Sequence, residues 1–286
     1  VLHYARTMIQ RAEFLLKTPD SQEPLYVQRW KSDEGPSEAT ILITHGVAEH
    51  SDCYHTTAES LAQQRFQVFA WDLPGHGKSY GQRGYIDSFD EFTDRLDFVI
   101  QEVRKLIVDH SPLYLLGHSL GGLITLKYII DHPKIDIKGV VLSSPALGVN
   151  VAVPPLKDRA ARILNVVAPK ITIPHELNFE DLSRDRALIS TYGKDPLRHK
   201  KFSAPLYLGI LKTMEDVHAR AHHIELPIYI QAAGHDRIVN TLDTQQFFTK
   251  ISSPQKKLQI YKESYHEIYN DINRQEVIDD LVRYLR

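Results

Sequence analysis

A serine between two glycines is the residue of this chain best placed to act as a nucleophile. Gly117-His118-Ser119-Leu120-Gly121 begins within the last residues of a short apolar run at 112–119 and leads into an apolar stretch with helical spacing at about 121–131. A strained strand-to-helix turn needs small neighbours, and it leaves the serine hydroxyl exposed above the strand end. The pattern predicts a nucleophile elbow at Ser119. The alternative is a glycine-rich connection that does no chemistry.

A serine hydroxyl needs a base to take its proton and a carboxylate to orient that base. Asp236 follows an apolar run that ends at Ala233, and His266 follows one that ends near Ser264. Both lie where parallel strands end, the sheet edge at which this class of fold places its sites. The order serine, aspartate, histidine is also that of the α/β-hydrolase arrangement. We therefore predict that Ser119, Asp236 and His266 form a catalytic triad.

An acyl-transfer site also needs two N–H donors for the oxyanion of its tetrahedral intermediate. One is predicted to be the N–H of Leu120, which follows the nucleophile at the start of a helix. The other should come from the loop after an earlier strand, where Thr44-His45-Gly46-Val47 places Val47 as the second donor. The alternative for this loop is an ordinary strand-ending turn.

The strands and helices that must position these residues are predicted to alternate along the chain. Apolar runs predict strands at 39–46, 66–75, 112–119, 137–145, 226–234 and 257–264. Helical spacing occupies 89–110, about 121–131 and 275–286. We predict an α/β fold, a mostly parallel, doubly wound sheet with helices on both faces. An antiparallel hairpin, 13–17 and 24–30 around the turn residues Pro19 to Ser21, is expected at one edge.

The alternation breaks between about Ala146 and Glu225. This stretch contains six prolines, and its best pattern is a helix at 156–167 with Pro155 at its start. We predict a hydrolase core made of residues 1–145 and 226–286, with residues 146–225 inserted as a largely helical cap. The apolar helix at 156–167 has two readings, because its stripe suits either packing on the core or contact with a membrane.

Composition narrows the classes of partner and cofactor. The chain has 286 residues, a formal charge of −2 and a pI near 6.8, so no nucleic-acid partner is expected. One cysteine, Cys53, permits neither an intrachain disulfide nor a cysteine zinc cluster. His218, His222 and His223 lie at near-helical spacing without carboxylate partners and are read as a solvated helix face. We expect no metal and no cofactor.

The chain lacks an apolar run long enough to span a bilayer. We expect a soluble, cytoplasmic protein, with peripheral membrane contact through the cap as an open alternative. The chain begins at Val1, and the sequence does not tell what precedes it. The oligomeric state is also left open.

Four segments together resemble the monoacylglycerol lipase and lysophospholipase family of α/β-hydrolases, which belongs with the serine aminopeptidase S33-like hydrolases. They are His45-Gly46-Val47-Ala48-Glu49-His50-Ser51, Trp71-Asp72-Leu73-Pro74-Gly75-His76-Gly77-Lys78-Ser79, Gly117-His118-Ser119-Leu120-Gly121-Gly122 and Ser264-Tyr265-His266-Glu267. The resemblance extends into the insertion at 182–197. It implies the same triad and oxyanion donors, and a cap over an acyl-chain tunnel.

The resemblance is incomplete where a head group would bind. In animal monoglyceride lipases a glutamate, an arginine and a histidine hold the glycerol. Glu49 matches the glutamate, but Cys53 stands at the arginine position and Tyr269 at the histidine position. A cysteine that the animal enzymes carry after the catalytic aspartate is Val239 here. We expect Glu49 and Tyr269 to contact the substrate.

These observations predict a serine hydrolase that cleaves the carboxyl ester of single-chain lipids through an acyl-enzyme. Monoacylglycerol is the first candidate substrate and lysophospholipid the second. A short-chain or aromatic carboxylesterase is the alternative enzyme, because related folds change substrate through the cap while keeping the triad. A binding protein that retains the fold without turnover is the alternative from another class.

Overall fold

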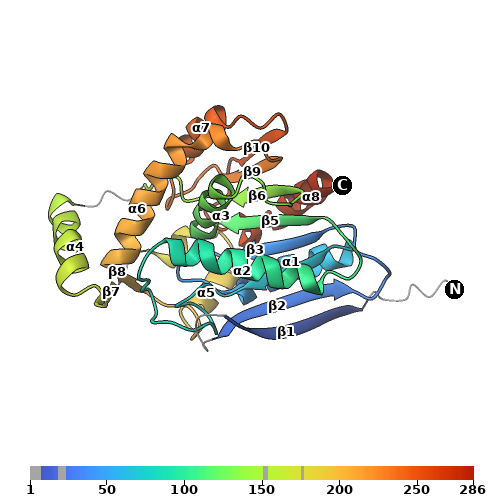
Figure 1. The fold of residues 1–286 in the computed structure, drawn as a ribbon, viewed down its shortest axis with the longest axis horizontal. Helices are drawn as coiled ribbons and strands as arrows, with labels where there is room; N and C mark the ends of the chain where they lie inside the picture. Colours follow the sequence, from blue (N-terminus) through green and yellow to red (C-terminus); the bar gives the residue numbers. More distant parts are fainter. Residues whose placement is uncertain (1–7, 19–23, 151–153, 175–176) are drawn as a thin grey trace.

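The computed structural model describes residues 8–18, 24–150, 154–174 and 177–286. At its centre is an eight-stranded sheet in the order β1-β2-β4-β3-β5-β6-β9-β10 (Figure 1). The strands are β1 Ile9–Lys17, β2 Pro24–Ser32, β3 Thr40–Thr44, β4 Gln67–Trp71, β5 Leu113–His118, β6 Gly139–Ser143, β9 Ile228–Ala233 and β10 Lys256–Tyr261. The six strands from β4 to β10 are parallel, and β2 joins them antiparallel through β4. The predicted mostly parallel sheet is confirmed.

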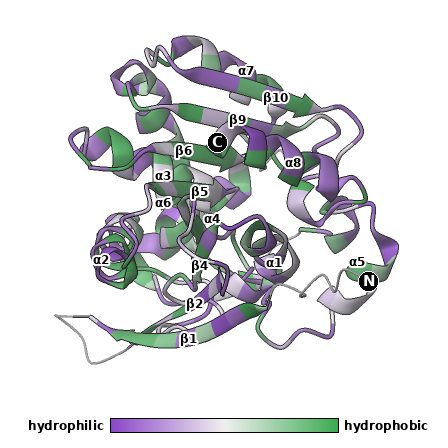
Figure 2. Ribbon diagram, turned by 90° about the vertical axis from the view of Figure 1, so that its right-hand side faces the viewer, coloured by the Kyte–Doolittle hydropathy of each residue, from purple (hydrophilic) through white to green (hydrophobic). Residues whose placement is uncertain are grey.

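Helices cover both faces of this sheet (Figure 2). They are α1 His55–Gln63, α2 Asp90–Leu106, α3 Leu120–Asp131, α4 Pro155–Val167, α5 Arg186–Tyr192, α6 Ala204–Ala219, α7 Thr241–Lys250 and α8 Arg274–Leu285. Side chains of α2, α3, α6 and α7 pack in the core on one face, and those of α1 and α8 pack on the other.

Successive side chains of each strand point to opposite faces of the sheet, so each strand contributes residues to both cores. Leu42 of β3 points to the core beneath α2 and α3, whereas its neighbours Ile41 and Ile43 point to the core beneath α1 and α8. All three side chains are fully buried. A strand covered on both faces needs apolar residues at every position, which explains why these strands appear in the sequence as unbroken apolar runs.

Several elements differ from the sequence prediction. The predicted hairpin forms over β1 and β2, although its turn residues Pro19 to Ser21 lie outside the described residues. Helices α1, α5, α6 and α7 were not predicted individually. In α1 the sequence HTTAESLAQ buries only Thr57, Ala58, Leu61 and Ala62. Small and polar residues give too weak an apolar period to be recognised as a helix in isolation.

The chain between β6 and β9 forms α4, α5 and α6 with a short antiparallel pair, β7 Thr172–Pro174 and β8 Lys201–Ser203. In Figure 1, α4 lies at the outer side of the molecule beside α6. No residue of α4 is buried. Within the described ranges, no helix combines the length and apolar character needed to cross a membrane.

Candidate active site

Ser119 lies on the turn between β5 and α3, in a strained backbone conformation with φ 51° and ψ −116°. The flanking glycines are required by close contact. A Cβ on Gly121 would lie 2.1 Å from the carbonyl oxygen of Thr44, and one on Gly117 would lie 2.5 Å from that of Gly121. The tight packing of α3 against the ends of β3 and β5 therefore explains the glycine spacing, and it leaves the Ser119 side chain at the cavity wall.

The structure brings His266 and Asp236 together at the carboxyl ends of β10 and β9. The Nδ1–H of His266 donates to Oδ2 of Asp236 at 2.8 Å, and both side chains are almost completely buried. Oδ1 of Asp236 accepts from the backbone N–H groups of Ile238 and Val239, at 2.8 and 2.9 Å. These bonds fix the carboxylate, and the carboxylate in turn holds the proton on Nδ1, which leaves Nε2 of His266 free to accept one.

Burial opposes the charged form of His266, but the Asp236 carboxylate outweighs it and raises the pKa of this imidazole above its ordinary value. The neighbouring His118, whose ring centroid lies 4.8 Å from that of His266, behaves oppositely. Burial and the proximity of His266 lower the pKa of His118 to about 3. His118 Nδ1 instead lies 3.0 Å from the Ser143 carbonyl oxygen. Only His266 of this pair is electrostatically prepared to receive a proton.

The loop after β3 lies against the serine. A Cβ on Gly46 would lie 3.1 Å from Cβ of Ser119, a tighter contact than most Cβ atoms make, so glycine favours this close approach. Two hydrogen bonds of the His45 ring fix this loop. Its Nε2 accepts from the N–H of Leu73 at 3.0 Å, and its Nδ1 donates to the Gly46 carbonyl at 2.7 Å. Val47 lines the cavity beside Ser119, and Leu120 opens α3, where the first N–H groups lack helical partners.

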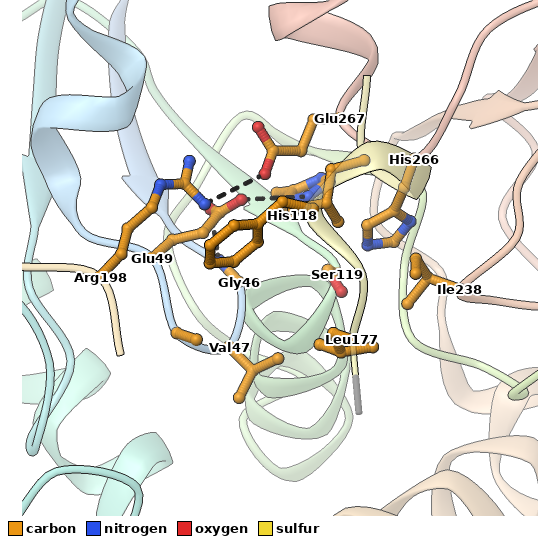
Figure 3. Close-up of a pocket in the computed structure, with 13 residues that line it drawn as sticks. Gly46, Val47, Glu49, His118, Ser119, Leu177, Arg198, Ile238, His266 and Glu267 are labelled. Carbon is orange, nitrogen blue, oxygen red and sulfur yellow. Dashed lines mark hydrogen bonds and ion pairs between the residues drawn. The ribbon is translucent and has the colours of Figure 1, made fainter. Parts of the chain in front are cut away.

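The cavity above Ser119 has one apolar and one polar side (Figure 3). Its volume is about 20 Å³, roughly the room of one water molecule. The apolar lining residues are Val47, Ala48, Leu177, Phe179, Leu182 and Ile238. Besides Ser119 and His266, the polar lining residues are Glu49, His118, Arg198 and Glu267, which Figure 3 shows gathered together. Apolar and polar side chains are therefore segregated on different sides of Ser119.

Glu49 lies on the polar side, 4% exposed. Its Oε2 accepts from the N–H of Gly46 at 3.1 Å and from the hydroxyl of Tyr54 at 3.0 Å. Burial, with the nearby Glu267 carboxylate, raises the pKa of Glu49 to about 8. Glu49 is therefore largely a neutral acid at pH 7, able to donate a hydrogen bond as well as to accept one.

Two residues of the polar side were not predicted from the sequence. Arg198 Nη1 lies 3.4 Å from Glu267 Oε1, and both side chains are at most 4% exposed. Although burial favours the neutral acid, Arg198 lowers the pKa of Glu267 to about 2. Arg198 Nη2 also lies 3.3 Å from Cys53 Sγ. Arg198 thus reaches Cys53 from a segment 145 residues away, and no local motif in the sequence marks this contact.

Tyr269 does not lie at this cavity. Its ring packs in the core beneath α1 and α8, and its hydroxyl donates to Gln231. Sequence position placed it three residues after His266, but the short 3₁₀ turn at Ile268–Asn270 directs the side chain into the core. Asp271, the carboxylate five residues after His266 in the sequence, pairs with Arg184 at 3.0 Å, whereas His266 is bonded to Asp236.

His218, His222 and His223 belong to no metal-binding arrangement among the described residues. His218 Nε2 lies 2.7 Å from the Leu147 carbonyl oxygen and its ring packs on Phe247, so it is half-buried rather than solvated as predicted. His222 and His223 contact each other at 4.2 Å between ring centroids. Throughout the described part of the chain, no group of three or more His, Cys, Asp and Glu residues is arranged to hold a metal ion.

Comparison with known proteins decides the family. The family model "Serine aminopeptidase, S33" matches residues 35–273. The chain belongs to this family. Phospholipase YtpA of Bacillus subtilis is 32% identical over 87% of this chain and 94% of its own. The monoacylglycerol lipase of Mycolicibacterium smegmatis is 28% identical over 90% of each chain.

A solved crystal structure has the same architecture. The crystal structure of the Paleococcus ferrophilus monoacylglycerol lipase is 30% identical, covers 97% of this chain and 98% of its own, and superposes with a TM-score of 0.80. The predicted α/β-hydrolase fold is therefore confirmed, as is the prediction of a carboxylic ester hydrolase.

Proposed function

We propose that this hydrolase cleaves esters by nucleophilic catalysis, with Ser119 as nucleophile, His266 as base and Asp236 as the acid that orients it. The observation that carries the proposal is the convergence of three elements on one cavity. Ser119 from the β5–α3 turn and His266 from the β10 end line it together, and Asp236 from the β9 end is bonded to His266. Two loops that approach from different strands supply the candidate oxyanion donors, Val47 and Leu120.

The reaction follows from this arrangement. Ser119 Oγ attacks the ester carbonyl carbon while His266 Nε2 takes the hydroxyl proton, and Asp236 stabilises the resulting imidazolium. The N–H groups of Val47 and Leu120 donate to the oxyanion. His266 then gives its proton to the departing alcohol. Water, deprotonated by the same imidazole, attacks the acyl-enzyme and releases the carboxylic acid.

The substrate class proposed is a single-chain lipid ester, monoacylglycerol first and lysophospholipid second. The apolar side of the cavity suits an acyl chain, and the polar side suits the alcohol. Glu49, largely neutral at pH 7, is proposed to hydrogen-bond the leaving alcohol. The names of the relatives from Bacillus subtilis and Mycolicibacterium smegmatis, a phospholipase and a monoacylglycerol lipase, support both candidates.

Residues 146–225 are proposed as a cap that covers the cavity and meets the lipid surface. Leu177, Phe179 and Leu182 close the cavity from this segment. On its outer side, α4 and the neighbouring β7 expose six aliphatic side chains, Leu156, Ile163, Val166, Val167, Ile171 and Ile173, each at least 53% exposed. Exposed basic residues accompany them at Lys157, Arg159 and Arg162. Apolar residues beside basic ones are typical of helices that lie in a membrane interface.

The test of this function is covalent labelling. A fluorophosphonate probe should label the folded protein at Ser119, and Ser119→Ala should abolish labelling and lower the turnover of a decanoyl ester by up to about 10⁶-fold. Ser144→Ala is the matched control, since Ser144 also has a positive φ of 40° but is absent from the cavity lining. Turnover by the Ser119→Ala protein within tenfold of the parent would contradict the proposed nucleophile.

A further inference from the structure

A second, larger cavity lies directly beside the one above Ser119. It has a volume of about 330 Å³, within the range of small-molecule binding sites, about 300–1,000 Å³. Residues at the start of α1, residues of α5 and Asn270 and Arg274 near the start of α8 line it. Arg198 lines both cavities, so its side chain forms part of the wall between them.

Contacts on several sides fix the Arg198 side chain in place between the two cavities. Its guanidinium carbon lies 3.6 Å from the ring centroid of Tyr192, Nη1 is 3.4 Å from Glu267, and Nη2 is 3.3 Å from Cys53 Sγ. The side chain is 4% exposed. A guanidinium has five N–H donors, and the contacts to Glu267 and Cys53 are long and engage two of its nitrogens. Donor capacity is left for an oxygen-bearing ligand on either side of the wall.

The lining of the larger cavity is polar but balanced in charge. Arg274 pairs with Asp185 at 3.0 Å, and His50 pairs with Asp195 at 2.7 Å. Asp52 pairs with Arg11 at 2.6 Å. An anionic or cationic ligand would have to compete with these internal pairs, whereas hydroxyl groups can add hydrogen bonds to them without displacing a charge. The chemistry therefore favours a neutral polyol.

We propose that this cavity receives the alcohol half of the substrate, a neutral polyol head group, and that Arg198 is the residue that recognises it. The inference rests on the proposed ester hydrolysis at Ser119. With the acyl chain on the apolar side of the catalytic cavity, the alcohol points to the side formed by Glu49, Arg198 and Glu267. Beyond that wall lies room for a head group larger than glycerol.

The first experiment fills part of the larger cavity with a bulky side chain placed on α1. Thr56 lines it from α1 and is exposed, so Thr56→Phe intrudes without touching the catalytic cavity. Gln63→Phe, exposed on the same helix and absent from the lining, is the matched control. The substrates are the glycerol, sorbitol and methyl esters of decanoic acid. We expect Thr56→Phe, but not the control, to lower the sorbitol-to-methyl ratio of kcat/KM at least tenfold.

The second experiment removes the guanidinium of Arg198, the group proposed to recognise the head group. Arg198→Met keeps the length of the side chain, and Arg198→Lys keeps the charge. We expect Arg198→Met to lower the glycerol-to-methyl and sorbitol-to-methyl ratios of kcat/KM about tenfold or more, with partial recovery in Arg198→Lys. Thermal unfolding of each variant identifies loss of folding, in which case the Thr56 series decides alone.

The outcomes separate this inference from the proposed function. If the parent cleaves methyl decanoate but all ratios stay unchanged in the Thr56 and Arg198 variants, the cavity does not bind the alcohol and only this inference fails. A selective effect on lysophosphatidic acid, with none on the polyol esters, would also overturn it in favour of an anionic head group. If the parent cleaves none of the decanoyl esters and Ser119 is not labelled, the proposed function itself fails.

Discussion

At the scale of the residue, the site places two titratable groups under opposite influences. Asp236 raises the pKa of His266, whereas burial and the nearby Glu267 carboxylate raise the pKa of Glu49 to about 8. The first effect stabilises the charged imidazolium that forms during reaction, and the second keeps an acid neutral near physiological pH. Both effects depend on exclusion of water from the cavity, because charge interactions weaken in a high dielectric.

The raised pKa of His266 predicts the acid limb of the pH profile. The base must be neutral to act, so kcat/KM should fall as the pH drops through a midpoint above 6.5, the ordinary value for histidine. Asp236→Asn should move this midpoint to lower pH and reduce kcat by about 10⁴-fold. Measurement of kcat/KM from pH 5 to 9 checks both. An unchanged midpoint in Asp236→Asn would remove Asp236 from its role.

The raised pKa of Glu49 predicts a stability effect with a definite sign. Between the ordinary value of 4.5 and about 8, the folded protein holds a proton on Glu49 that the unfolded chain releases. The contribution of Glu49 to the free energy of unfolding therefore decreases as the pH rises through this window.

Glu49→Gln, which cannot ionise, should lose this dependence, so its stability relative to the parent should improve from pH 5 to 8 by about 1–4 kcal/mol. Urea unfolding at pH 5, 6.5 and 8 measures the difference. Glu59→Gln on α1, where the carboxylate is 46% exposed, is the control. Parallel stability profiles for the parent and Glu49→Gln would contradict the assignment of a neutral Glu49.

At the scale of the element, α4 differs from every other helix of the described chain in burying no residue. Leu156 and Val166 are each 79% exposed, and α4 packs beside α6 at the outer side of the molecule. A helix of this kind gains little from packing on its own protein, so its apolar side chains remain available to another apolar phase.

Polar substitution on α4 should weaken attachment to lipid. Leu156→Ser with Val166→Ser should reduce binding to phospholipid vesicles at least tenfold, because burial of each large aliphatic side chain contributes about 1.5–3 kcal/mol. Hydrolysis of a dissolved short-chain ester should not change. Asn165→Ser, on an exposed position of the same helix, is the control. Vesicle sedimentation measures the binding, and equal binding by all three proteins would contradict membrane contact through α4.

At the scale of the whole molecule, the closed form described here cannot hold a substrate. About 20 Å³ above Ser119 admits one water molecule, so the segment that contributes Leu177, Phe179 and Leu182 must move before an ester can enter. Opening exposes apolar surface on this segment and on the core beneath it. A lipid that covers this surface stabilises the open form, as any ligand favours the state that binds it.

Acyl-chain length should therefore control catalytic efficiency. Each buried methylene contributes up to about 0.8 kcal/mol, or roughly threefold to fourfold in kcat/KM. We expect kcat/KM for nitrophenyl esters to rise from two carbons to medium chains and then level as the apolar space fills. Steady-state kinetics over chains of two to twelve carbons measure this. A steady decline from the acetyl ester upward would favour the alternative short-chain carboxylesterase.

The sequence by itself determined the parts of this protein whose signals are local. Buried parallel strands require unbroken apolar runs, and the turn at Ser119 requires glycines where backbone oxygens approach within 2.1–2.5 Å of a would-be Cβ. The parallel strands and the Asp236–His266 contact could be predicted because the carboxyl ends of parallel strands share one edge. Helices α1, α5, α6 and α7 escaped individual prediction because tertiary packing, not a strong apolar period, stabilises them.

Only the tertiary structure decided the polar side of the site. Arg198 meets Cys53 and Glu267 across 145 and 69 residues, and these contacts depend on how the inserted segment lies on the core. The fold also directs the Tyr269 hydroxyl to Gln231 and buries Glu49 close to the Glu267 carboxylate. Charge, burial and side-chain direction at such long-range contacts are properties of the folded molecule, because no local spacing along the chain specifies them.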